Sequence, residues 1–164
     1  MAHTRISRSN ALIDFEVQLV TQANNAYDAG DVVAELITFA KVAEAGRGSA
    51  GFRVVSACIK DLDAQDVDYD LFLFDANPSG TTLTLDSALD VADADLPKLI
   101  GHVNIDDGIA FADSIYLRGE PDKPLYFALP EEGTDLFGVL VTRGTPTYAA
   151  SAAGVSVRLV LERL

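Results

Sequence analysis

The sequence has few of the residue types that most often carry chemistry. Its 164 residues include one cysteine, two histidines and no tryptophan. The single cysteine, Cys58, excludes an intramolecular disulfide and a cysteine-based zinc site. Because Cys58 lies inside an apolar run, we expect a buried, unreactive thiol. His3 and His102 do not stand at a spacing that brings metal ligands together, so neither predicts a metal site.

Basic residues are scarce as well. Twelve Lys and Arg against 25 Asp and Glu give a formal net charge of −13. Since phosphate backbones are negative, this charge disfavours direct binding to nucleic acid. No apolar run approaches the ~20 residues of a membrane helix, and the first ten residues are too polar for a signal peptide. We therefore expect a protein that is made in a host cytoplasm and contacts no membrane.

A recognisable catalytic motif is also lacking. Ser49 and Ser79 lie beside glycines, but this is only a superficial likeness to the turn that exposes a nucleophilic serine. There is no glycine-rich phosphate loop. So acidic a chain offers carboxylate pairs for glycoside hydrolysis, but the absence of tryptophan argues against a sugar cleft. We predict that the protein is not an enzyme and uses no cofactor.

What the sequence does contain is a series of short apolar runs separated by glycine and proline. This pattern is typical of antiparallel strands joined by turns. In the last run, apolar and polar residues alternate, which predicts one buried and one exposed face. The apolar positions are Val155, Val157, Leu159 and Leu161. About nine or ten such runs and almost no helix predict an all-β fold, an antiparallel β-sandwich with jelly-roll-like winding.

The length of the chain fits a single domain. Residues 1–13 include Arg5 and Arg8 without any periodicity, so we predict a flexible, basic N-terminal arm. Residues 14–164 are predicted to form one β-sandwich domain, whose first strand alternates over residues 15–19.

Some internal segments are ambiguous. Residues 32–45 suit a helix or a strand, and we predict a strand that forms a hairpin with residues 52–60. We predict a short strand at 81–85 and a short helical or turn insertion at 86–99. Gly138 interrupts an apolar strand, which predicts a β-bulge or, alternatively, a close contact with another subunit.

Five aspartates stand close together in one segment. They are Asp61, Asp63, Asp66, Asp68 and Asp70. Calcium requires several converging oxygen ligands, and dense aspartate can supply them. The segment lacks the glycine and terminal glutamate of an EF-hand loop, and alternate strand residues project in a row rather than around an ion. We expect a solvated loop, with a metal site as the weaker alternative.

Several blocks of the sequence resemble small virion structural proteins of tailed bacteriophages. The blocks occur in the same order over most of residues 27–162. They are Ala29-Gly-Asp-Val-Val-Ala, Asp70-Leu-Phe-Leu-Phe-Asp-Ala-Asn-Pro, Pro124-Leu-Tyr-Phe-Ala-Leu, Asp135-Leu-Phe-Gly-Val-Leu-Val-Thr-Arg-Gly-Thr-Pro-Thr-Tyr and Val155-Ser-Val-Arg-Leu-Val-Leu-Glu. Residues 130–133 depart from that pattern by shortening a polar link between strands. The resemblance implies a non-enzymatic particle component with no catalytic residues.

The function that the resemblance implies is that of a capsid decoration or cement protein. Such a protein binds the major capsid protein lattice on the phage head surface and stabilises the head. We also expect contact with copies of the same chain, as a homotrimer, since 49% apolar residues are more than one surface should tolerate. Arg5, Arg8, Phe137 and Gly138 are the predicted contact residues. The alternatives are a carbohydrate- or ligand-binding β-sandwich module, with or without calcium, and a neck or tail structural component.

Overall fold

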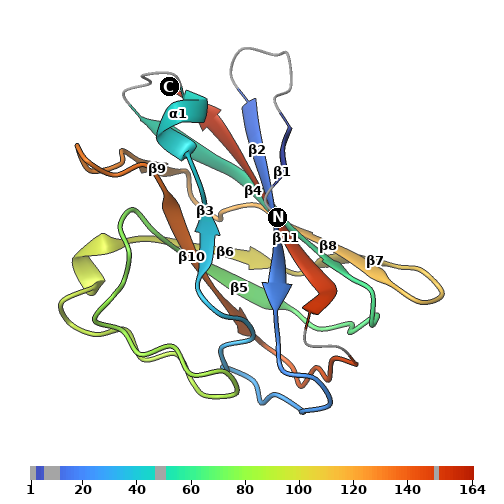
Figure 1. The fold of residues 1–164 in the computed structure, drawn as a ribbon. Helices are drawn as coiled ribbons and strands as arrows, with labels where there is room; N and C mark the ends of the chain where they lie inside the picture. The colour runs from blue at the N-terminus through green and yellow to red at the C-terminus, as the bar shows by residue number, and fades with distance from the viewer. Residues whose placement is uncertain (1–2, 6–11, 47–50, 150–151) are drawn as a thin grey trace.

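Two antiparallel sheets pack face to face in the structure, a computed structural model that describes residues 3–5, 12–46, 51–149 and 152–164 (Figure 1). The seven-stranded sheet has the order β1-β2-β11-β4-β8-β7, with β9 also paired to β4, and the four-stranded sheet has the order β3-β10-β5-β6. The described strands are β1 (His3–Arg5), β2 (Leu12–Val20), β3 (Ile37–Phe39), β4 (Phe52–Asp61), β5 (Tyr69–Phe74), β6 (Leu99–Ile105), β7 (Asp107–Ala110), β8 (Ile115–Gly119), β9 (Leu125–Phe127), β10 (Leu136–Thr142) and β11 (Ala152–Arg163).

The strand pairing is that of a jelly roll. β5 pairs with β6, β4 with β8, β3 with β10 and β2 with β11, so the partners are nested along the chain. Successive nested pairs belong alternately to the two sheets. The chain is thus one long hairpin, with its turn between β5 and β6, wrapped into a sandwich. The predicted all-β sandwich is confirmed, and β1, β7 and β9 extend one of its sheets.

The core lies between the sheets. Val155, Val157, Leu159 and Leu161 of β11 are all at most 1% exposed, which confirms the predicted buried face of this strand. Phe15 of β2 meets Phe39 of β3 edge to face, with ring centroids 6.5 Å apart, and so links the two sheets. Burying a side chain of this size contributes about 1.5–3 kcal/mol to stability.

A second apolar cluster covers the outer face of the four-stranded sheet. Its buried members are Val32, Phe74, Val139 and Val141. The loop between β5 and β6 packs over them with the side chains of Leu83, Leu85, Leu89 and Val91. Both faces of this sheet are therefore covered, one by the other sheet and one by a loop.

Of the two predictions for the loop between β5 and β6, the strand at residues 81–85 is wrong, and the short helical or turn insertion at residues 86–99 is confirmed. Residues 81–85 form no strand, because their alternating leucines pack on a sheet surface instead of pairing within a sheet. Residues 86–99 contain a single 3₁₀ turn, η1 (Leu96–Lys98). Asp95, which is 1% exposed, ties the loop together by accepting hydrogen bonds from Thr81 Oγ1 at 2.8 Å and Lys98 Nζ at 2.7 Å.

The predicted hairpin between residues 37–42 and 52–60 is wrong. β3 pairs with β10 in one sheet, whereas β4 lies in the other sheet between β11 on one side and β8 and β9 on the other. The chain between them forms a short helix, α1 (Val42–Gly46). Val42 and Gly46, four residues apart on one face of the helix, are both buried, which is the spacing of an α-helix that packs on the core. Within the described residues, no helix is long and apolar enough to span a membrane.

Gly138 does not mark a bulge. It stands opposite Ile37 on one side and Leu73 on the other, within continuous registers. A Cβ atom on Gly138 would lie 3.1 Å from both Leu71 Cδ1 and Phe39 Cε2, so the glycine makes room for these core side chains. The register shift between β4 and β11 instead leaves Val55 as the extra residue of a bulge.

The N-terminal segment begins within the seven-stranded sheet. β1 pairs with β2, so that His3 lies opposite Glu16 and Arg5 opposite Asp14. The core begins at Ile13, which is 3% exposed and falls within the predicted arm of residues 1–13. Arg8 lies outside the described residues, and the flexibility of the arm stays a prediction.

Candidate functional site

The predicted aspartate loop is held in place by its own hydrogen bonds. The carboxylate of Asp61, fully buried at the end of β4, accepts the N–H groups of Asp63 at 2.7 Å and Gln65 at 3.0 Å. Burial raises the pKa of the Asp61 carboxyl, while the two N–H donors act in the opposite direction. Asp63 in turn accepts the N–H of Ala149 at 2.9 Å, and Gln65 Oε1 accepts that of Thr147 at 2.9 Å.

The other three aspartates do not join Asp61 and Asp63 around a common point. Asp70 is buried on β5 and forms an ion pair with Arg143, while Asp66 and Asp68 are exposed. The described residues contain no group of three or more His, Cys, Asp or Glu side chains that could hold a metal ion. The aspartate segment therefore has a structural role, since its side chains connect residues 61–70 to residues 143–149. Sequence reasoning missed its partners because they lie 73 to 86 residues away.

Three buried tyrosines support the same end of the sandwich. Tyr69 and Tyr148 share a hydrogen bond between their hydroxyl groups at 2.7 Å. Tyr27 donates its hydroxyl to the carbonyl of Val33 at 3.0 Å, and its ring meets that of Tyr148 edge to face. Burial raises the pKa of both Tyr69 and Tyr148. Because each hydroxyl has a partner, these rings can be buried without an unpaired polar group.

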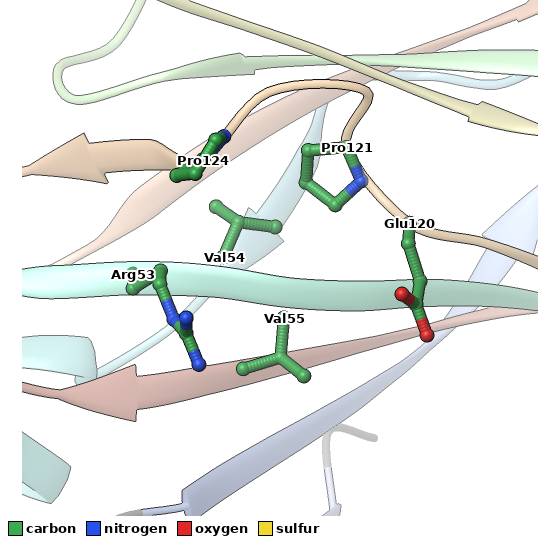
Figure 2. Close-up of a pocket in the computed structure, with 6 residues that line it drawn as sticks. All are labelled: Arg53, Val54, Val55, Glu120, Pro121 and Pro124. Atoms are coloured by element: carbon green, nitrogen blue, oxygen red, sulfur yellow. The ribbon is translucent and has the colours of Figure 1, made fainter.

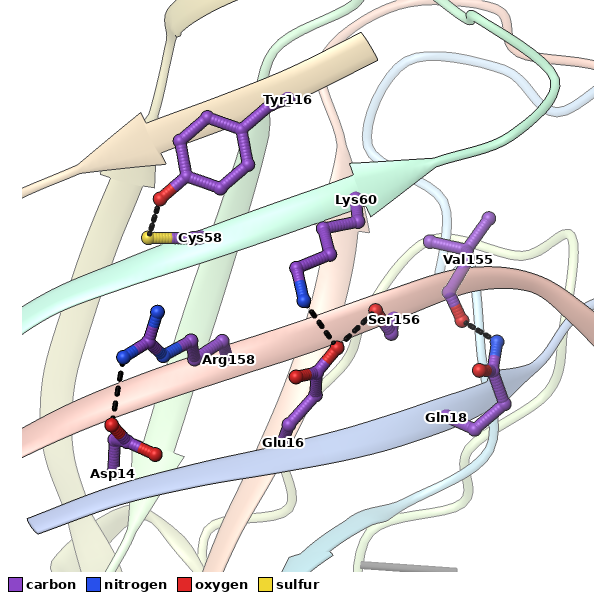
Figure 3. A network of polar contacts seen from close by, with 9 residues as sticks. All are labelled: Asp14, Glu16, Gln18, Cys58, Lys60, Tyr116, Val155, Ser156 and Arg158. Atoms are coloured by element: carbon purple, nitrogen blue, oxygen red, sulfur yellow. Dashed lines mark hydrogen bonds and ion pairs between the residues drawn. The ribbon is translucent and has the colours of Figure 1, made fainter. Parts of the chain in front are cut away.

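The outer face of the seven-stranded sheet carries a polar network that runs across the strands (Figure 3). Its contacts are Arg158 to Asp14 at 2.7 Å, Lys60 to Glu16 at 2.6 Å, Ser156 to Glu16 at 3.2 Å, Gln18 Nε2 to the Val155 carbonyl at 2.5 Å, and the Tyr116 hydroxyl to Cys58 Sγ at 2.9 Å. The hydrogen bond from Lys60 lowers the pKa of Glu16, against the opposing effect of burial. Cys58 is 3% exposed, as predicted. Asp14 and Glu16 are each paired with a basic side chain, so the network connects β2, β11 and β4 across the sheet.

A small hollow of about 180 Å³ lies beside the bulge in β4 (Figure 2). It is lined by Arg53, Val54, Val55, Glu120, Pro121 and Pro124. Both charged residues have partners outside the hollow, Arg53 with Glu162 at 2.7 Å and Glu120 with Arg118 at 2.5 Å. The remaining walls are aliphatic, so the hollow contains no acid and base that face each other.

The β7–β8 hairpin projects from the edge of the sandwich (Figure 1). A concave surface larger than the first lies beside this hairpin. This surface, which we call the hairpin hollow, has a volume of about 310 Å³ and is lined by Lys60, Asp61, Leu62, Phe111, Ser114, Ile115 and Tyr116. Leu62 is 63% exposed, Phe111 61% and neighbouring Ile109 60%. Exposed apolar side chains that lie together are typical of interaction surfaces.

The sequence alone indicates no site at residues 109–117. The available signal was the pair Ile109 and Phe111 between aspartates, but it became meaningful only once Leu62 was brought alongside by the end of β4.

The predicted contact residues do not form one surface. Phe137 is half-buried against the second apolar cluster, and Gly138 faces the core. Arg5 belongs to β1, in the other sheet, and Arg8 lies outside the part of the chain that the structure describes. The core position of Gly138 accounts for the glycine without a contact to another subunit.

Comparisons with known proteins do not assign the chain to a family. No family model and no curated protein matches it. Among solved structures, the chain is similar to one described as the native virion of Kashmir bee virus at neutral pH, with 13% identity and a TM-score of 0.29 over 97% of this chain and 74% of that chain. A likeness at this TM-score supports no argument about function, so the description of the fold rests on the strand pairing.

Proposed function

We propose that this chain is a structural protein of a tailed-phage virion, and specifically a capsid decoration protein that binds the major capsid protein and stabilises the head. The observation that carries the proposal is the hairpin hollow, where the lining residues Leu62 and Phe111 are each more than 60% exposed. Ile109, on the strand that leads into Phe111, is 60% exposed as well. Leaving apolar surface in water costs about 25 cal/mol for each Å², and contact with a second protein removes that cost.

Three further features support the proposal. The side chains that sequence reasoning offered for chemistry, such as Asp61, Asp63 and Cys58, are instead engaged in contacts within the fold. Two apolar clusters and a cross-strand network make a rigid body, as a particle component requires. The sequence resemblance over residues 27–162 adds the phage context. Association with copies of the same chain, as a trimer on the head surface, belongs to this proposal.

The proposal is tested with heads that lack the protein. Purified chain is added to such heads, and we expect it to sediment with them and to raise the temperature at which they open. Heads that already carry the protein are the control and should take up none. Failure to sediment with heads, together with binding to tails or to a glycan, would contradict a decoration role.

A calcium-dependent ligand-binding module is less well supported. The carboxylates of Asp61 and Asp63 accept backbone N–H groups, and a calcium ion would have to displace those donors.

A further inference from the structure

The shape of the hairpin hollow suits one large apolar side chain. Ile115, 3% exposed, lies at the buried side of the hollow, while Leu62 and Phe111 stand mostly in solvent on its rim. Its volume of about 310 Å³ is at the lower limit of ligand pockets, which hold roughly 300–1,000 Å³. An apolar side chain placed there would contact all three residues and bury them.

β7, which ends one residue before Phe111 of the hollow, has a free edge. β7 is the last strand of the seven-stranded sheet and pairs only with β8 among the described strands. All four of its residues, 107–110, are exposed. An edge strand presents backbone N–H and C=O groups that an extended segment of another protein can pair with.

The charge around the hollow is negative. Asp63 follows Leu62 by one residue, and Asp113 lies in the turn of the hairpin. Asp107 of β7 stands opposite Arg118 and adds no unopposed charge. The one lysine that lines the hollow, Lys60, is already paired with Glu16 at 2.6 Å. A partner with positive charges would therefore be attracted to this surface.

The same charges argue against a second copy of this chain as the occupant. Each copy carries a formal net charge of −13. A symmetric contact through the hairpin would place the same aspartates of both copies against each other, which is destabilising.

We propose that the hairpin hollow and the edge of β7 together bind an extended segment of a partner protein that carries one large apolar side chain flanked by lysine or arginine. The inference deepens the proposed function, because the capsid protein would supply this segment. Binding of such a segment requires only the purified chain, so it can be measured without phage particles.

The test uses a synthetic peptide, acetylated Lys-Thr-Arg-Val-Phe-Thr-Arg-Thr-Lys. One control replaces each Lys and Arg by Glu, and the other replaces Val and Phe by Ser. Titration is followed by the amide resonances of the full chain. We expect only the first peptide to bind, to shift the amides of residues 107–119, and to lose about tenfold in affinity at high salt because the attraction is screened.

Matched variants locate the site. Phe111→Ser should weaken binding of the basic peptide at least about tenfold, the effect expected when an anchoring aromatic contact is lost. Tyr126→Ser, which removes a 58% exposed aromatic side chain from β9, should leave the affinity unchanged. Both side chains are mostly in solvent, so both variants should fold, which the thermal unfolding curve verifies.

Several results would overturn the inference. They are equal binding of the basic and acidic peptides, equal loss in the two variants, or a dimer in light scattering that Phe111→Ser dissociates. Head sedimentation separates this inference from the proposed function. If Phe111→Ser binds heads as tightly as the parent chain, the hollow is not the site although decoration stands. If the peptide binds but the parent chain ignores heads, the decoration role fails while the hollow stands.

Discussion

At several buried positions, the residue type is explained by its neighbours in the fold, which either need space or provide a hydrogen-bond partner. Gly138 is the clearest case, since the side chains of Leu71 and Phe39 pack closely against its Cα and leave little room for a Cβ atom. The pair of hydroxyl groups on Tyr69 and Tyr148 is another, because each is the other's partner inside the core. Both features are consequences of tertiary packing and not of local sequence.

Adding one methyl group at Gly138 should therefore destabilise the fold. We expect Gly138→Ala to lower the free energy of unfolding by about 1–3 kcal/mol, as overpacking typically does. Urea denaturation measures the change. Gly108→Ala, on the exposed edge strand β7, is the control and should have a smaller effect, because its new Cβ would stand farther from its neighbours, 3.3 Å from Leu117 Cδ2 and 3.4 Å from Ile115 Cδ1. Similar losses in both variants would contradict the packing account.

Removing both of the paired hydroxyl groups should cost less than the sum of the two single removals. Tyr148→Phe leaves the Tyr69 hydroxyl buried without its partner, so we expect a loss of about 1–3 kcal/mol in unfolding free energy. The double variant Tyr69→Phe with Tyr148→Phe should be less destabilised than the sum of the single variants. Strictly additive losses in chemical denaturation would show that the hydroxyl groups do not depend on each other.

At the scale of strands and loops, two features stabilise the structure. Polar side chains pair across the strands, and one long loop covers the outer face of the four-stranded sheet. The loop between β5 and β6 shields the outer face of the four-stranded sheet, and Asp95 connects Thr81 to Lys98 within it. The Lys60 and Glu16 pair bridges β4 and β2 across the intervening β11. Each of these contacts has a measurable consequence for its own element.

The loop should open when its central carboxylate is removed. Asp95→Ala leaves Thr81 and Lys98 without their shared partner, so we expect faster proteolytic cleavage within residues 75–98. Mass spectrometry of limited digests identifies the cleavage sites. Asp90→Ala lies in the same loop and serves as the control, with cleavage unchanged. Cleavage that is no faster than in the parent chain would mean that the apolar cluster alone holds the loop.

The Lys60 and Glu16 pair should contribute to stability only above acidic pH. Its hydrogen bond lowers the pKa of Glu16 from its ordinary 4.5, so the contribution is present above that value and is lost as pH falls through the lowered pKa. Both side chains are over a third exposed, so the effect of Glu16→Gln at pH 7 should be at most about 1 kcal/mol. Unfolding at pH 7 and pH 3 tests this, and a penalty that grows on acidification would contradict it.

For the whole molecule, the sequence predicted the class of fold better than the order of its contacts. Alternation along β11 was sufficient to identify a buried face, because residues such as Val157 and Leu159 face the core from a strand flanked on both sides. The segment around Ile37 was misassigned because nothing local shows that β4 already has neighbours on both edges. The aspartate loop was recognised as a loop, but its partners on residues 143–149 and the hairpin hollow depend on distant strands.

Calcium should affect the stability of the protein only through non-specific screening of its negative charge. Because the loop carboxylates face backbone donors and do not converge, added calcium should not raise the unfolding temperature more than magnesium at the same ionic strength. Differential scanning calorimetry makes the comparison. An upward shift specific to calcium would restore the loop as a metal site.

The direction of β11 has a practical consequence. Leu62 donates its N–H to Gly154 near the start of this strand, whereas Leu164 donates to Gly51 beyond its end. β4 separates these two points by ten residues, or about 30 Å of extended chain. A passenger domain fused after Leu164, which is 61% exposed, would stand clear of the hairpin hollow. The fold thus suits a carrier that displays a fused domain at one end while the hairpin hollow at the other end stays accessible.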